Sequence, residues 1–294
     1  MFESFGRSWD ITKTSFNVIK QDKELLLFPI LAGFFSIIFL IIMIFPFIIT
    51  SLVNTFFGEA LGTILEYVAV FILYLGFAFI ATFFNVCAVY TIKKRFEGGN
   101  AGFFESLKFA LSKIHLIFAW SVVSATVGLL LNILSNIAQK LGPIGSLIMG
   151  IVVSLLGGIW GIITIFVVPA MVYDNVGPLA AIKSSALTLK KTWGESLIRY
   201  VGLGLAQAII MIGVLVIGII VSIILMIVLP ILGIIVFLGL LLFLVLIALV
   251  FSLLNTVFNT ALFVYARTGT VPQGYNPEVI KSAFKQKQVK KGLF

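Results

Sequence analysis

Charged side chains are scarce in this sequence, and cysteine and histidine are almost missing. Only 11% of the 294 residues are Asp, Glu, Lys or Arg, against about a quarter in an ordinary soluble domain. The single cysteine, Cys87, and the single histidine, His115, exclude a disulfide framework and any metal site that needs several Cys or His ligands. Nucleophilic catalysis of the Ser–His type would have to use His115. We therefore predict no catalytic residues, no metal and no cofactor, and a protein that is not an enzyme.

The sequence is instead dominated by apolar side chains. Hydrophobic residues make up 61% of the chain, 29 residues are Phe, and the mean hydropathy is +1.21. The core of a soluble fold of this length could not hide so much apolar surface from water, and a disordered chain needs the opposite composition. This composition is typical of an integral membrane protein that crosses the bilayer several times.

Long runs without Asp, Glu, Lys or Arg give the number of crossings, since a membrane-spanning helix needs about 20 largely apolar residues. The last such run covers residues 200–266, which is too long for one helix. A break is expected at Leu229-Pro230, because proline lacks a backbone donor, and Gly233 lies just beyond. The sequence thus predicts six spans, at residues 25–53, 62–92, 114–138, 146–172, 200–228 and 232–266. The first run is too long for the core of a cleaved signal peptide and is predicted to be retained.

The basic residues orient these spans. All Lys and Arg except Lys140 fall before span 1, after the even-numbered spans or in the basic tail, residues 270–294. Lys and Arg concentrate on the cytoplasmic side of membrane proteins, so we expect both termini in the cytoplasm and a multi-pass protein of the cytoplasmic membrane. The net charge of +9 then indicates attraction to anionic lipid head groups. Nucleic acid is not an expected partner, since no soluble basic domain is present.

A short amphipathic segment precedes each odd-numbered span. The segments are residues 2–21, 102–113 and 178–193. Apolar residues recur in each at the three- and four-residue spacing of a helix, which predicts helices that lie in the head-group layer with the apolar face toward lipid. The expected fold is all-α: three hairpins of spans in a single membrane domain, residues 1–269, each hairpin preceded by a cytoplasmic interfacial helix.

Neutral polar residues enter the spans, whereas the deep parts of all six runs lack ionisable groups. Two interpretations stay open: these residues join helices by hydrogen bonds, or they line a narrow path or a lipid head-group pocket. Asn255 and Asn259 are four residues apart and share a helix face. The candidate polar membrane face comprises Asn85, Gln207, Asn255, Thr256 and Asn259.

Small residues recur at three- and four-residue steps in the predicted fourth span. A face of this kind lets another helix approach closely, either within the chain or in a second copy. The candidate helix-packing face comprises Gly150, Ser154, Gly157, Gly158 and Gly161.

Several short motifs lie where the amphipathic segments join the spans. They are Arg7-Ser8-Trp9 with Lys13 and Ser15, Asp22-Lys23-Glu24-Leu25-Leu26 with Phe28-Pro29, Ala81-Thr82-Phe83-Phe84-Asn85, Phe166-Val167-Val168-Pro169, Gly177-Pro178 with Ala181, Lys183 and Ser185, Lys191-Thr192-Trp193-Gly194-Glu195, and Tyr265 with Thr268-Gly269, Val271-Pro272 and Gly274. In this combination the chain resembles an uncharacterised, domain-of-unknown-function family of prokaryotic six-span membrane proteins. The resemblance implies a prokaryotic cytoplasmic membrane and brings no activity with it.

The motif residues also have a physical interpretation as contacts at the cytoplasmic junctions. Trp9 and Trp193 suit the head-group layer. The candidate contacts with lipid or a partner are Trp9, Lys13, Asp22, Lys23, Lys183, Lys191, Trp193 and Glu195. The same residues would serve as structural joints or as a binding site.

Three functions therefore stand at the level of sequence. The first is a structural or accessory protein that organises anionic lipid, or that binds a membrane partner or a second copy of the chain. The second is an uncoupled channel or facilitator for a small neutral or lipid-like solute. The third, a membrane-embedded enzyme, would require His115, Asp174 or Glu195.

Overall fold

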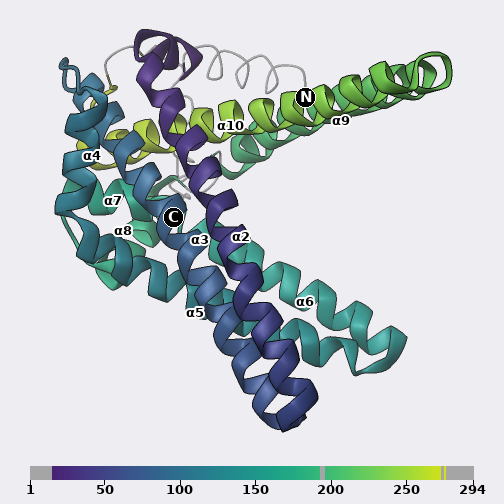
Figure 1. The fold of residues 1–294 in the computed structure, drawn as a ribbon. Coiled ribbons are helices and arrows are strands. Elements are labelled where there is room, and N and C mark those ends of the chain that lie inside the picture. The colour runs from purple at the N-terminus through teal and green to yellow at the C-terminus, as the bar shows by residue number, and fades with distance from the viewer. Residues whose placement is uncertain (1–14, 193–195, 273–274, 276–294) are drawn as a thin grey trace, which may run out of the picture. The chain divides into compact units, whose positions relative to one another are not determined.

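A computed structural model describes residues 15–192, 196–272 and 275, although not the side chains of residues 191–206. Within these ranges the chain forms helices with short connections and contains no strand. Six of the described helical segments are long and apolar enough to cross a membrane. The predicted all-α class with six spans is confirmed, and Figure 1 shows the helices in order along the chain.

The first named element is a short 3₁₀ turn, which follows helical residues 15–21. The elements are η1 (Lys23–Leu26), α2 (Leu27–Phe57), α3 (Glu59–Phe96), α4 (Phe103–Ser112), α5 (Ile114–Gln139), α6 (Gly142–Ile163), α7 (Val167–Asp174), α8 (Pro178–Thr192), α9 (Ser196–Val228) and α10 (Pro230–Thr268).

By their internal contacts the described residues form two compact units. One unit is Leu27–Arg95 with Gly99–Leu189, and the other takes the described residues of Met1–Leu26, Phe96–Gly98 and Lys190–Phe294. The first therefore holds α2 and α4 to α7 with nearly all of α3 and α8. The second holds α9, α10 and the residues before α2.

In the first unit, α2 and α3 pack against each other in opposite directions. The ring of Phe39 lies edge-on to Phe77, with centroids 5.7 Å apart. A Cβ atom at Gly76 would overlap the Phe39 ring, so glycine at this position lets the ring lie directly on the α3 backbone. Helices in lipid associate through such close contacts at small residues, because lipid tails are as apolar as the side chains they replace.

In the second unit, α9 and α10 lie side by side (Figure 1). Helix α9 ends at Val228 and α10 begins at Pro230, at the predicted break. Proline is tolerated at the first position of a helix, because an N–H group there would have no carbonyl acceptor within the helix. A Cβ atom at Gly233 would overlap the backbone nitrogen of Met226 and lie 2.6 Å from its Cα. Gly233 therefore sets how closely the two helices approach beside their turn.

The predicted fourth span is interrupted. Helix α6 ends at Ile163 and α7 starts at Val167. The hydroxyl of Ser185, from α8, donates to the carbonyl oxygen of Ile163 and accepts the N–H of Phe166 at 3.1 Å. It thus satisfies backbone groups that the break leaves without helical partners.

Pro169 lies just after the interruption. It is the third residue of α7, in the first turn, where its missing N–H removes no helical hydrogen bond. Pro46 lies inside α2.

The close approach at Gly233 predicts a large effect of a single methyl group. Gly233→Ala should destabilise the protein by about 1–3 kcal/mol, since backbone atoms of Met226 cannot move aside as a flexible side chain would. The measurement is the midpoint of thermal unfolding in detergent. The matched control is Gly239→Ala in the same helix, where no atom lies within 4 Å of the added Cβ. An equal, small effect of both changes would contradict the close approach.

The Ser185 bridge gives a second prediction. Ser185→Ala should cost about 1–3 kcal/mol, because the buried N–H of Phe166 loses its acceptor. Amide hydrogen exchange at residues 164–167 should become faster in the same variant. Ser112→Ala is the control, because that exposed hydroxyl bonds only to Phe109 of its own helix. Unchanged exchange in Ser185→Ala would show that the break does not depend on this hydroxyl.

Candidate functional site

The candidate polar membrane face is divided between the two units. Asn85 lies on α3 in one, and Gln207, Asn255, Thr256 and Asn259 lie on α9 and α10 in the other. The Oδ1 atom of Asn85 is buried and has no hydrogen-bond partner. The amide nitrogen of Gln207 is 3.6 Å from the sulfur of Met211, one turn further along α9.

The hydroxyl groups near Asn255 and Asn259 bond within their own helix. Thr256 donates to the carbonyl oxygen of Ser252 at 3.1 Å, and Thr260 donates to that of Thr256 at 2.7 Å. Each hydroxyl proton is thereby used inside α10. The neighbouring asparagine side chains are half-buried.

The small-residue face of α6 is exposed in the single chain. Gly150, Ser154, Gly158 and Gly161 are exposed, and added Cβ atoms at the three glycines would meet no atom within 4 Å. Gly157 alone among the five faces a neighbour, with Leu131 of α5 at 3.7 Å from its added Cβ. The face remains a prediction for contact with lipid or another chain.

The structure describes only some of the predicted junction residues. Trp9, Lys13, Trp193, Glu195 and the side chain of Lys191 lie outside the described residues. Asp22 is buried, and its carbonyl oxygen accepts the N–H of Leu25 in η1. Lys23 and Lys183 are exposed.

Each of the three amphipathic segments turns a serine inward. Ser15, Ser106 and Ser185 are all at most 1% exposed. Ser15 is 2.7 Å from the hydroxyl of Tyr275, Ser106 is 2.7 Å from that of Thr91, and Ser185 bridges the α6–α7 break. The residue four positions later is buried in every case, as Ile19, Ala110 and Leu189. This shared register is the signal by which sequence analysis could have found Ser106, which it missed.

The Tyr275 hydroxyl, which contacts Ser15, is kept protonated by its surroundings. Burial raises the pKa of the Tyr275 hydroxyl, and the hydrogen bond with Ser15 opposes this shift more weakly. The phenol therefore stays neutral at physiological pH, so it can both donate and accept. The ring of Phe96 packs edge-on against it at 5.9 Å.

The outward faces of the same segments pair a large apolar side chain with a lysine four residues later. The pairs are Phe16 with Lys20, Phe104 with Lys108, and Leu179 with Lys183. Phe104 and Leu179 are 80% and 77% exposed. Lys20 lies over the ring of Phe16, with its Nζ 5.1 Å from the ring centroid. Each segment thus buries a serine and leaves one large apolar side chain exposed beside a lysine.

The structure packs only part of the apolar stripe that the spacing of residues 178–193 predicts. That stripe comprises Leu179, Ile182, Ala186, Leu189 and Trp193. Leu189 is buried, Ile182 is half-buried, Leu179 and Ala186 are exposed, and Trp193 lies outside the described residues, whereas Ala181 and Ser185 are buried beside the stripe. Small side chains allow the helix to approach its neighbours closely, and the serine gains two backbone hydrogen bonds there. Leu179 and Ala186 are left exposed.

An aromatic cluster joins α3 to α4. The rings of Tyr90 and Phe109 stack with centroids 4.1 Å apart, and the Tyr90 hydroxyl donates to Glu105 at 2.7 Å. Lys94 lies over Tyr90 and Lys113 over Phe109, each with its Nζ 5.7 Å from the ring centroid. Sequence analysis did not find this cluster, because its members are brought together by the turn between the two helices.

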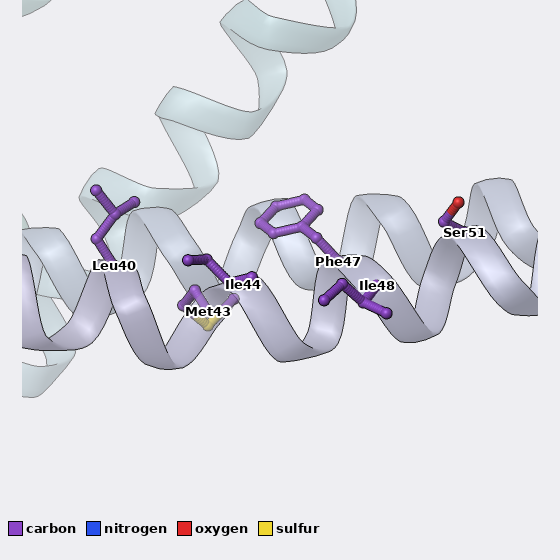
Figure 2. Close-up of a pocket in the computed structure, with 6 residues that line it drawn as sticks. All are labelled: Leu40, Met43, Ile44, Phe47, Ile48 and Ser51. Carbon is purple, nitrogen blue, oxygen red and sulfur yellow. The ribbon is translucent and has the colours of Figure 1, made fainter.

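Hollows also lie along α2. One, with a volume of about 340 Å³, is lined by Leu40, Met43, Ile44, Phe47, Ile48 and Ser51. Figure 2 shows that these side chains all come from the one helix, so the hollow is a depression on the surface of α2. Another, of about 270 Å³, is more polar and lies between α2 and α3, with Asn54 and Glu66 in its lining.

Comparison with known proteins gives a family and no activity. Among the described residues, no group of three His, Cys, Asp or Glu side chains is placed to hold a metal ion. No protein of curated function and no solved structure matches the chain. The model of a family of unknown function, DUF6159, matches residues 64–273, so the motifs before residue 64 lie outside the match. Since the match covers more than half of the sequence, the chain belongs to this uncharacterised family.

Proposed function

We propose that this protein is a non-enzymatic protein of the prokaryotic cytoplasmic membrane that binds and organises anionic phospholipid at the cytoplasmic face. The observation that carries the proposal is the uncovered pair of an apolar side chain and a lysine on each amphipathic segment. An apolar side chain of this kind can enter the acyl boundary of a bilayer. The lysine four residues later can reach the phosphate layer with its ammonium group.

The distribution of charge also supports a location of these three lysines at the cytoplasmic face of the membrane. Lys20, Lys108 and Lys183 belong to the segments that precede odd-numbered spans, and Lys140 is the one basic residue predicted on the opposite side. Anionic lipids of the cytoplasmic leaflet attract such residues by about 1 kcal/mol each near the surface. Both termini are then cytoplasmic, in agreement with an even number of spans.

A protein partner is the other occupant of these faces. A membrane protein or a second copy of the chain could cover Phe104 or Leu179 with apolar side chains, but it would have to supply a carboxylate to each neighbouring lysine. Anionic lipid supplies both the apolar and the acidic component in one molecule. We therefore favour lipid.

The lysines give the direct test. Changing Lys20, Lys108 or Lys183 to Gln should each lower the preference for phosphatidylglycerol over phosphatidylcholine by up to about fivefold. The measurement is the fraction of spin-labelled lipid that the protein immobilises in reconstituted vesicles, at low and at high salt.

Lys140→Gln is the matched control, since it removes one lysine from the opposite side and should leave the preference unchanged. The triple variant should lose the salt dependence of the wild-type preference. A triple variant with wild-type lipid selection would reject the proposal.

An uncoupled path for a small solute is the second candidate, and the buried Oδ1 of Asn85 is the observation that favours it. A buried acceptor without a donor costs about 1–3 kcal/mol, and a polar solute could supply the missing donor. Helix α10 offers two more amides, Asn255 and Asn259, one turn apart.

Solute release separates the two functions. Under the lipid proposal, vesicles that contain the wild-type protein should retain small neutral solutes and ions as well as vesicles with Asn255→Leu/Asn259→Leu. The measurement is the release of a trapped solute from vesicles with verified protein orientation. Release by the wild type that the double change abolishes would instead establish a path through the protein.

A further inference from the structure

An aromatic groove opens on the first unit where α2, α3 and the α4–α5 junction meet. Its volume is about 420 Å³, within the usual range for a small-molecule site. It is lined by Phe35, Ile38, Phe39, Ile42, Phe79, Ile80, Phe83, Phe84, Leu111 and Ile114. No charged side chain is among these residues.

The wall of this groove is a connected series of phenyl rings. Phe35 stacks on Phe84 at 5.8 Å, Phe84 meets Phe83 edge-on at 5.3 Å, and Phe83 stacks on Phe79 at 6.2 Å. Rings held by one another in this way keep their shape when a ligand arrives, so the groove is largely preformed. A preformed apolar slot suits a flexible hydrocarbon chain, because only the chain, and not the slot, then loses conformational freedom on binding.

The α3 residues of the groove lie well away from the basic end of that helix. Phe84 and Phe79 lie 9 and 14 residues before Lys93, which corresponds to about 14 and 21 Å along α3. Half of the hydrocarbon core is about 15 Å thick. With Lys93 at the boundary of the hydrocarbon core, this part of the groove would lie near the middle of the bilayer, where an acyl chain ends.

Two lysines neighbour the groove residues of the α4–α5 junction in the sequence. Leu111 and Ile114 line the groove on either side of Lys113 in the sequence, and Lys108 lies one turn before Leu111 on the exposed face of α4. Lys113 is placed over Phe109, while the nearby carboxylate of Glu105 accepts a hydrogen bond from Tyr90. Two lysines therefore belong to the same α4–α5 junction as the groove residues Leu111 and Ile114.

We propose that this groove binds one acyl chain of an anionic phospholipid, whose head group is held by Lys113 and Lys108. The inference rests on the proposed function, which supplies the anionic phospholipid of the cytoplasmic leaflet as the ligand. It goes further by assigning that lipid to one defined site. Neutral apolar surface and flanking lysines match the two parts of a phospholipid, whereas a second copy of the chain would bring its own lysines to the same rim.

The test places a bulky tryptophan side chain in the groove and compares it with the same substitution on α2 outside the groove. Ile42 lines the groove and Ile41 does not, although both are isoleucines of α2 that are 60% exposed. The full chain is reconstituted in nanodiscs of phosphatidylglycerol and phosphatidylethanolamine, extracted in mild detergent and analysed by native mass spectrometry. The wild type and Ile41→Trp should retain one phosphatidylglycerol, and Ile42→Trp should lower its retention by about tenfold.

The head-group contact is tested by Lys113→Gln. This change should lower the preference for phosphatidylglycerol over phosphatidylethanolamine in the retained lipid by about fivefold. Lys140→Gln, at the other end of α5, is the control and should leave the preference unchanged.

A labelling experiment needs no variant. Phosphatidylglycerol with a photoreactive group in the acyl chain should label Phe35, Phe39, Phe79 or Phe83 in preference to Ile37 and Ile41 on the outer side of α2. Equal labelling around α2, equal retention by Ile42→Trp and Ile41→Trp, or no retained lipid in the wild type would each overturn the assigned site. The variants Lys20→Gln and Lys183→Gln, which lie outside the groove, test the proposed function separately: if they lose lipid selection in vesicles while the groove fails, only the groove is rejected.

Discussion

The lack of water in the bilayer is the constraint on which the rest of this structure depends. A backbone group that leaves a helix there must find a partner within the protein. The interruption between α6 and α7 meets this requirement through the Ser185 hydroxyl, which serves Ile163 and Phe166 together. Because the partner comes from α8, satisfying the break also fixes that helix against the spans of its unit. Ser106 attaches α4 to α3 through Thr91 in the same manner.

Hydrogen bonds of this kind allow a helix to be attached to the spans while some of its large apolar side chains stay exposed. In lipid, burying a leucine against protein brings little gain, since acyl chains offer an equally apolar environment. Helix α8 is held by Ala181, Ser185 and Leu189, which are buried, while Leu179 remains exposed. One face of the helix therefore attaches it to its unit, and the proposed function assigns the exposed face to lipid.

The sequence was sufficient for the features that depend on length and composition. Runs without charge predicted the six spans, and Leu229-Pro230 predicted the end of α9, because a proline cannot continue the hydrogen-bond pattern of the preceding helix. The break after Ile163 could not be predicted, since neither Gly nor Pro lies in residues 164–166 and its stabilising hydroxyl comes from about 20 residues later in the chain. The inward face of α8 was missed for a related reason, because periodicity shows an apolar stripe but not whether protein or lipid covers it. The Phe groove was likewise hidden, since its wall combines α2 with α3.

A lipid in that groove would also contribute to the fold. The open slot between α2, α3 and the α4–α5 junction leaves part of its aromatic wall exposed, with Phe35 46% exposed. A phospholipid acyl chain would fill this slot with dispersion contacts. Any ligand that binds only the folded state stabilises it in proportion to the logarithm of its concentration. The lipid composition of the membrane would then set the stability of this unit as well as the occupancy of the site, so that a protein without charged groups deep in its spans would still sense the membrane around it.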